Sequence, residues 1–261
     1  IQNDSVGSFF EHKDSVYCIG MLNKEPFDTF VTGDGNDRAL IWKIEKVEEN
    51  KEEQKEEQKE EGAKDPNEEM KVQEEGKTKE TPQQYKSILV QSISHTETVE
   101  FTKYSFDGKF LVTGGMNNQV KVWSSEKNYE QKCVFDGPTD DINFIDWHPK
   151  GNVVICGGKD YMIWMFNGQS GEYLSSFAGH EDEVLSAKFT PLDGGKQIVS
   201  SSADKTIRLW SPMKNNCLQT LRNPAAIANE SKFHITDIST IALHHERPMV
   251  MSGDLGGKVF V

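Results

Sequence analysis

Four residue types that can form a hydrogen-bonded chain recur along this sequence at nearly constant spacing. In the most complete copy, His180 is followed by Ser200, Asp204 and Trp210. A buried histidine needs hydrogen-bond partners, because an unsatisfied buried polar group costs about 1–3 kcal/mol. A turn carboxylate and a strand hydroxyl can supply those bonds. The pattern therefore predicts a structural network that is repeated along the chain.

Weaker copies of this set lie upstream. Two of them carry Asn in place of Asp: His12, Thr32, Asn36 and Trp42, then His95, Thr113, Asn117 and Trp123. A further copy keeps only the Asp: Pro138, Cys156, Asp160 and Phe166. We expect that unit to rely on apolar packing instead of the hydrogen-bonded set.

The segments around these residues predict short strands. Each copy has a β-branched residue followed five positions later by an apolar one: Val16/Met21, Val99/Tyr104, Ile142/Trp147, Val184/Phe189 and Ile238/Leu243. Turn residues follow, and then a second apolar segment that ends at Thr32, Thr113, Cys156, Ser200 or Ser252. Alternating strands and turns at a period of about 40 residues indicate an all-β repeat architecture.

With a histidine near its start and a tryptophan at its end, the repeat resembles the WD40 β-propeller. The resemblance implies one propeller domain over residues 1–261 with about five blades present. Val261 falls inside the third strand of the fifth copy, and five blades would leave unsealed sheet edges. Because propellers have about 4–8 blades, we expect a fragment of a seven- or eight-bladed ring.

An acidic insertion over residues 45–85 interrupts the first blade between its third and fourth strands. Residues 45–80 hold fifteen acids and eight lysines, a net charge of −7 out of −13 for the chain. Without an apolar period the segment cannot offset its chain entropy, which predicts a solvated, disordered loop. A transient helix, or a tethered acidic bait for a basic partner, is the alternative.

Acidic residues also gather in the loop that leads into the first strand of each copy, here called the leading loop. They are Asp14, Glu97, Asp140, Asp141, Asp182, Glu183 and Asp237. One interpretation is ordinary loop polarity with capping of backbone amides. The other is a set of partner-binding carboxylates that steers a basic protein segment. Few basic residues are interleaved, so direct nucleic-acid binding is disfavoured.

No residue set indicates catalysis, a metal site or a cofactor. His244 and His245 are adjacent, so on a strand their rings would point to opposite faces. No run approaches the roughly 18 apolar residues of a membrane span. Four scattered cysteines without a Cys-x-x-Cys pair indicate a reducing compartment, so we expect a cytoplasmic and also nuclear protein.

A narrower resemblance rests on Trp147-His148-Pro149, on Trp164 near the end of the third copy, and on the Gly-rich stretch 112–123. These are similar to the family of the angio-associated migratory cell protein, whose fungal relative is a chaperone of a large-subunit ribosomal protein. The resemblance implies a non-enzymatic chaperone that holds a basic ribosomal protein segment. The alternative is a general WD40 scaffold or adaptor in signalling, ubiquitin ligation or ciliary and cytoskeletal assembly.

Overall fold

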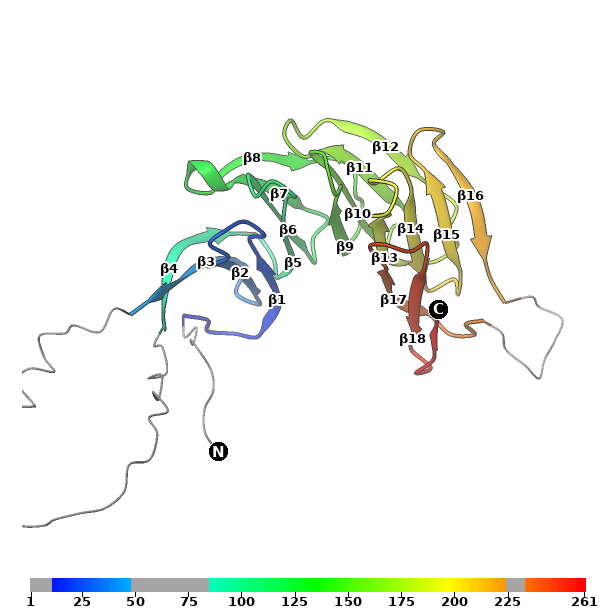
Figure 1. Cartoon of the computed structure of the whole chain (residues 1–261), viewed down its shortest axis with the longest axis horizontal. Helices are drawn as coiled ribbons and strands as arrows, with labels where there is room; N and C mark the ends of the chain where they lie inside the picture. Colours follow the sequence, from blue (N-terminus) through cyan, green and yellow to red (C-terminus); the bar gives the residue numbers. More distant parts are fainter. Residues whose placement is uncertain (1–10, 48–84, 224–232) are drawn as a thin grey trace, which may run out of the picture. The chain divides into compact units, whose positions relative to one another are not determined.

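The computed structural model describes residues 11–47, 85–223 and 233–261, whose regular secondary structure is almost entirely β-strand (Figure 1). The first sheet contains β1 (Val16–Met21), β2 (Thr29–Asp34), β3 (Arg38–Lys46) and β4 (Tyr85–Ser94). The second contains β5 (Val99–Tyr104), β6 (Phe110–Gly115), β7 (Val120–Ser124) and β8 (Glu130–Phe135), with the short helix η1 (Ser125–Lys127). The third contains β9 (Ile142–Trp147), β10 (Val153–Gly158), β11 (Ile163–Asn167) and β12 (Tyr173–Phe177). The fourth contains β13 (Val184–Phe189), β14 (Ile198–Ser202), β15 (Ile207–Ser211) and β16 (Asn216–Leu221), and the fifth β17 (Ile238–Leu243), β18 (Val250–Asp254) and β19 (Val259–Phe260).

Every sheet is an antiparallel meander in which consecutive strands pair. This confirms the all-β, blade-like repeat expected from the sequence. The chain forms two compact units, one of residues 1–10 and 44–88 and one of residues 11–43 and 89–261. The insertion expected over 45–85 belongs to the first unit and, apart from its ends, lies outside the described residues. No helix in the described ranges has the length and hydropathy needed to cross a bilayer.

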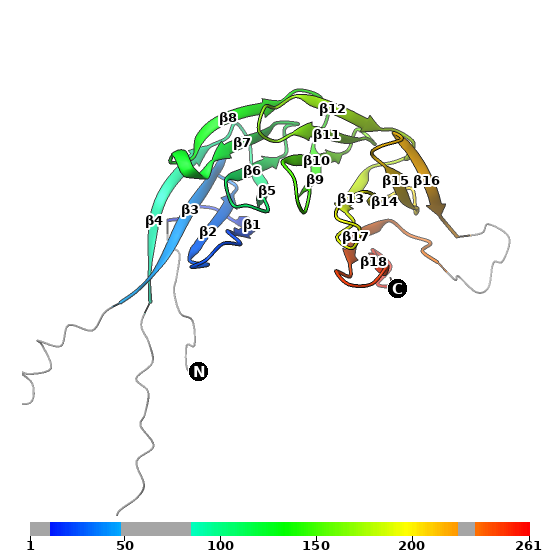
Figure 2. The same cartoon turned by 45° about the horizontal axis from the view of Figure 1, so that its top comes forward.

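Within the larger unit, the hydrophobic cores lie between consecutive sheets. One cluster joins Phe110 and Val122 of the second sheet to Trp147 and Phe166 of the third, and comparable clusters join the other neighbours. The second strands β6 and β14 are buried along their whole length, and β10 is buried after its first residue, because both faces of these strands are covered. The first strands β5, β9 and β13 lie side by side (Figures 1 and 2).

The first strand of each sheet carries a register irregularity close to its start. The irregularity falls between Val16 and Cys18, between Val99 and Phe101, and at the corresponding places in β9, β13 and β17. A β-bulge of this kind bends the strand and redirects one side chain. The bulge therefore sets the direction in which every leading loop joins its sheet.

Candidate protein-binding loops

The fourth sheet forms the complete hydrogen-bonded set that its sequence predicts. Nδ1 of His180 lies 2.8 Å from an oxygen of Asp204, and Nε2 lies 2.7 Å from Oγ of Ser200. The indole N–H of Trp210 donates to the same hydroxyl at 2.8 Å. Burial raises the pKa of Asp204, but hydrogen bonds from His180 and Thr206 outweigh it and hold that pKa below its ordinary value.

In the first sheet the carboxylate comes from a different residue, and the prediction of Asn36 is wrong. His12 contacts Thr32 at 2.7 Å and Asp34 at 2.9 Å, while Trp42 donates to Thr32 at 2.8 Å. Asp34 is the last residue of β2, so its side chain faces the histidine from the strand end. Asn36 instead donates its backbone N–H to Asp34 at 3.0 Å.

The fifth sheet repeats this shifted arrangement with a histidine that the sequence analysis missed. His234 is fully buried, and its two ring nitrogens each lie 2.8 Å from oxygens of Asp254 and Ser252. The available signal was spacing, because His234 precedes Ser252 by the same 18 residues that separate His95 from Thr113.

The second sheet has only part of its predicted set. His95 lies 2.7 Å from Thr113, and Trp123 donates to the same hydroxyl at 2.7 Å. Asn117 bonds Thr96 instead of the histidine, so the prediction of Asn117 as the fourth member is wrong. Its side-chain amide donates to the Thr96 hydroxyl. Burial, and then nearby Lys121, lower the pKa of His95 to about 4.

The third sheet replaces the set with apolar packing, as its sequence indicates. Phe166 is fully buried and stacks on Phe135 with ring centroids 4.4 Å apart. Asp160 keeps a turn role, because it accepts the indole N–H of Trp164 at 2.8 Å and the backbone N–H of Met162 at 3.1 Å. Trp164 is therefore anchored by a hydrogen bond as well as by packing.

All five sheets hold the leading loop against the turn between the second and third strands, here called the second turn. In each, a second-turn N–H donates to a leading-loop carbonyl, at 3.0 to 3.4 Å: Gly35 to Ser15, Met116 to Thr98, Lys159 to Asp141, Ala203 to Glu183 and Leu255 to Asp237. The acidic loops therefore occupy the same place in every sheet, next to the start of the first strand, where the bulge lies.

Part of the acidic pattern is explained by capping. Asp14, Asp140 and Asp182 each accept the backbone N–H of the following residue, at 2.7 to 2.8 Å. Each of these carboxylates has a second oxygen that can take another donor. Asp14, Glu97 and Asp140 are exposed, and the other four predicted residues are half-buried. Capping therefore explains why aspartate is favoured here, and it leaves charge available to a partner.

Four of the predicted carboxylates come close together across the third and fourth sheets. Lys159 forms an ion pair with Asp141 at 2.7 Å, and this contact, with weaker help from Glu183 and Asp140, raises the pKa of Lys159. Asn143, the bulge residue of β9, donates to Glu183 at 3.2 Å. Asp182 directly precedes Glu183 in the same loop.

The second sheet adds a carboxylate that the sequence analysis did not select. Burial, and then the charge of Asp141, raise the pKa of Glu100, the bulge residue of β5. Within the described residues, Asp14, Glu97 and Asp237 form no ion pair with Lys159, the cation of this cluster. A bulge residue of one sheet thus reaches the leading loop of the next, which brings the acids of neighbouring sheets together.

Comparison with known families accounts for the repeated strands. Residues 87–124, 129–167 and 171–211 match the family model described as WD domain, G-beta repeat. Each matched stretch begins at the fourth strand of one sheet and ends with the third strand of the next. The matches cover the second, third and fourth copies and pass over the two copies whose aspartate is shifted.

Curated relatives resemble the chain at low identity. It is 21% identical over 253 residues to the angio-associated migratory cell protein of Homo sapiens, which is 97% of this chain and 46% of the relative. It is 23% identical over 170 residues to pre-mRNA-splicing factor cwf17 of Schizosaccharomyces pombe, 65% of this chain and 46% of the relative. It is 31% identical over 122 residues to the serine-threonine kinase receptor-associated protein of Dictyostelium discoideum, 47% of this chain and 40% of the relative. The chain thus spans less than half the length of these relatives.

Proposed function

Because the chain carries WD40 repeats, we propose that it is a non-enzymatic protein-binding propeller whose leading loops contact the partner. The observation that carries this proposal is the recurrence of a carboxylate in every leading loop, at a place that the same backbone bond fixes in all five sheets. Fixed carboxylates of one sign raise the local negative potential and attract a positively charged ligand. Protein interaction through such loops requires no reactive group.

The partner chemistry that suits these loops is a segment rich in lysine and arginine. Lys159 neutralises only part of its cluster, because that one ammonium group pairs with Asp141 and interacts electrostatically with Asp140, Glu183 and Glu100 as well. The finer proposal is that the segment belongs to a newly made large-subunit ribosomal protein, which the protein shields until assembly in the cytoplasm or nucleus. The acidic loops and the family resemblance support this choice.

A second candidate is a scaffold within another assembly. The relative cwf17 is named a pre-mRNA-splicing factor, and another relative is named pre-mRNA-processing factor 19. Those names favour a role among the proteins of a splicing assembly. In that case the loops would bind one defined protein surface, and ribosomal peptides would compete no better than other basic peptides.

The test neutralises three leading-loop carboxylates while retaining their hydrogen-bond acceptors. The triple variant Glu97→Gln, Asp140→Asn and Asp182→Asn keeps a side-chain oxygen for each capped backbone N–H. Fluorescence anisotropy would follow its binding to labelled amino-terminal peptides of large-subunit ribosomal proteins across a salt series. We expect about a tenfold loss of affinity at low salt, shrinking as salt screens the charges.

The matched control removes three exposed acids elsewhere, with the substitutions Glu126→Gln, Glu130→Gln and Glu172→Gln. It changes the net charge equally and should bind the peptides nearly as well as the original chain. Equal losses in both triple variants would show that only net charge matters, and the loop assignment would fail. Equal affinity for ribosomal peptides and for polylysine would remove the ribosomal part of the proposal and leave the scaffold.

A further inference from the structure

A pocket of about 380 Å³ opens at the other end of the first strands, away from the leading loops. Lys103 and Lys188 line it together with aromatic and proline side chains, among them Phe106, Trp147 and Pro191. All of these residues belong to the larger unit. The pocket therefore combines cationic groups with apolar walls, the opposite character to the acidic loops.

Three charged residues hold the same register position in three neighbouring first strands. Lys103 pairs with Val112, Asp146 with Ile155 and Lys188 with Val199, each in the fifth position of its strand. Since β5, β9 and β13 lie side by side, the three side chains form a row in the order Lys, Asp, Lys. The fold thus sets two cations beside a single carboxylate.

Both carboxylate oxygens of Asp146 have a partner. One of its oxygens pairs with the ammonium group of Lys103, and the other accepts the backbone N–H of Phe189 at 3.0 Å. In the described part of the chain, Lys188 has no ion-pair partner. Burial, and then the charge of Lys103, lower the pKa of Lys188, and the opposing charge of Asp146 does not cancel this shift.

The other titratable groups near the pocket form no ion pair with Lys188 in the described part of the chain. His148 packs edge-on against Phe189 with ring centroids 5.0 Å apart, and burial lowers its pKa, so it stays neutral at pH 7. Asp193 and Lys150 act on His148 with opposite signs. One ammonium group, that of Lys188, is left to meet a ligand.

We propose that this pocket binds a side-chain carboxylate of an acidic peptide, with Lys188 as the anchor and the aromatic walls holding a neighbouring apolar side chain. A single ammonium group without a direct ion pair matches one negative charge, which favours a carboxylate over a doubly charged phosphate. The inference is independent of the leading loops, because it concerns the other end of the strands. The protein then has one surface for a basic partner and another for an acidic one.

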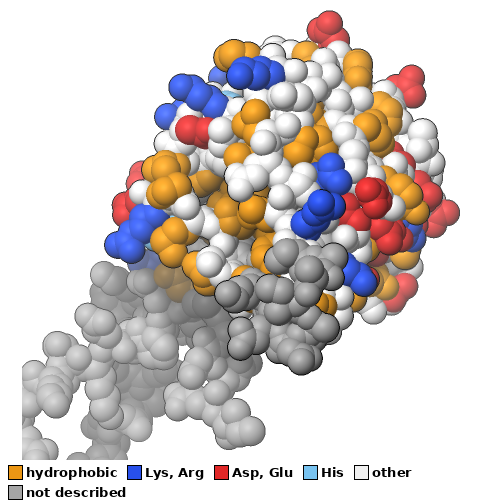
Figure 3. All heavy atoms as spheres, turned by 90° about the vertical axis from the view of Figure 1, so that its right-hand side faces the viewer, with side chains coloured by type: hydrophobic (Ala, Val, Ile, Leu, Met, Phe, Trp, Pro, Cys, Tyr) orange, Lys and Arg blue, Asp and Glu red, His pale blue; other side chains and the backbone are white. Residues whose placement is uncertain are grey.

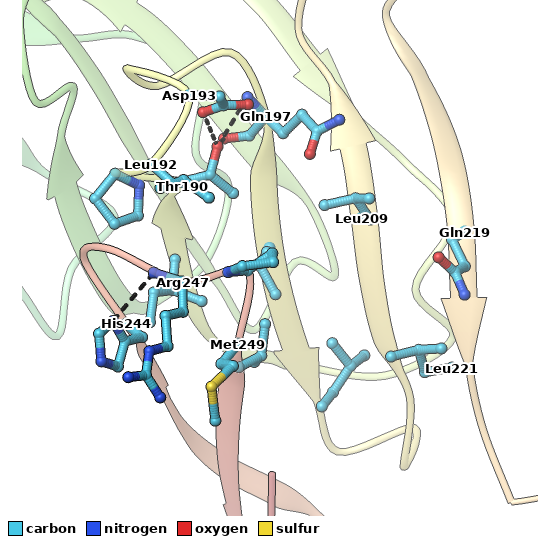
Figure 4. Close-up of a pocket in the computed structure, with 16 residues that line it drawn as sticks. Thr190, Leu192, Asp193, Gln197, Leu209, Gln219, Leu221, His244, Arg247 and Met249 are labelled. Atoms are coloured by element: carbon cyan, nitrogen blue, oxygen red, sulfur yellow. Dashed lines mark hydrogen bonds between the residues drawn. The ribbon is translucent and has the colours of Figure 1, made fainter.

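A larger hollow of about 450 Å³ between β14–β16 and β17–β18 offers no comparable selectivity (Figure 4). Its walls include Leu209, Leu221 and Met249, and Arg247 lies beside His244 at its rim. On the side of the molecule that carries β15 and β16, hydrophobic side chains are visible between charged ones (Figure 3). Nothing among the described residues shows what covers this hollow.

The experiment measures binding of a short fluorescein-labelled peptide rich in Glu and Phe, by anisotropy, with its Gln analogue as the neutral comparison. We expect the Gln analogue to bind about tenfold more weakly, since bonds between charged partners are the stronger ones. Lys188→Gln should cause a similar loss, whereas Lys188→Arg should retain binding. Lys150→Gln, at an exposed neighbouring lysine, is the matched control and should bind normally.

A second readout locates the peptide. The indole N–H of Trp147 donates to the carbonyl of Lys103 at 2.9 Å, so its proton resonance should shift when the Glu peptide binds. Equal binding by Lys188→Gln and Lys150→Gln would overturn the proposal, as would displacement of the peptide by inorganic phosphate at equal concentration. The leading-loop triple variant should bind this peptide normally, so failure here and failure of the proposed function are distinguishable.

Discussion

Replacing Asn117 with Asp should give the second sheet the carboxylate that its histidine lacks. Asn117 bonds Thr96, the residue directly after His95, at 2.5 Å. Asp204 holds the same turn position in the fourth sheet and lies 2.8 Å from Nδ1 of His180. We therefore expect a carboxylate at residue 117 to reach Nδ1 of His95.

The expected change in the free energy of unfolding follows from the pKa of His95, which burial and then Lys121 lower from 6.5 to about 4. A histidine whose pKa is depressed on folding contributes fully to stability above pH 6.5, and that contribution is lost as the pH falls through 4. Between about pH 7.5 and pH 5 these two values give a loss of about 2 kcal/mol in the free energy of unfolding. A carboxylate beside His95 raises its pKa, so Asn117→Asp should recover about 1 kcal/mol of that loss.

The assay is urea unfolding, followed by tryptophan fluorescence, at several pH values between 7.5 and 5. Gln131→Glu adds the same charge at an exposed position of β8 and serves as the control, since other groups titrate in this range too. The quantity compared is the difference in pH dependence between the two variants. Proton NMR of the His95 ring would report its pKa directly.

Two results would refute the reasoning. One is an identical pH dependence of unfolding in Asn117→Asp and Gln131→Glu. The other is a pKa of His95 that remains near 4 in the variant, because a carboxylate in contact with the ring must raise it. Either result would mean that the turn does not bring residue 117 to the imidazole.

Four further substitutions, one of them a control, test other parts of the fold by urea unfolding. Gly115→Ala should destabilise the fold by several kcal/mol, because the added Cβ would clash with the carbonyl oxygen of Thr98. Gly253→Ala is the control and should cost about 1 kcal/mol or less, because the atom nearest to its added Cβ lies 3.3 Å away. Asp204→Ala should cost about 2 kcal/mol, since it leaves buried donors without their acceptor. Phe166→Ala should cost about 3–5 kcal/mol, because the third sheet depends on this ring.

The repeat and its strands were predictable because the copies share a β-branched and apolar pair in the first strand, turn residues after it, and an aromatic residue near the end. The fourth set was also predictable, because Ser200, Asp204 and Trp210 stand at the family's usual spacing. Asp34 and Asp254 were missed since both lie two residues before the expected turn position. Spacing alone does not show which of two neighbouring acids faces the imidazole.

Other features depend on how separate strands are placed in space. Lys103, Asp146 and Lys188 lie about 40 residues apart, and nothing in their local sequence sets them in one row. Glu100 was missed because the bulge that turns it toward the next leading loop leaves no mark in the residue pattern. The partner-binding role of the seven predicted acids stays a prediction, although four of them do come together.

Two positions, the last residue of the second strand and a residue of the second turn, can hold the aspartate that meets the histidine, as Asp34 and Asp204 show. A repeat can therefore relocate this residue during evolution by first acquiring an acid at the second position and then losing the original one. Neither step passes through a blade without a carboxylate, so such drift would be nearly neutral. A divergent blade can in this way lose the recognisable motif while its buried network survives.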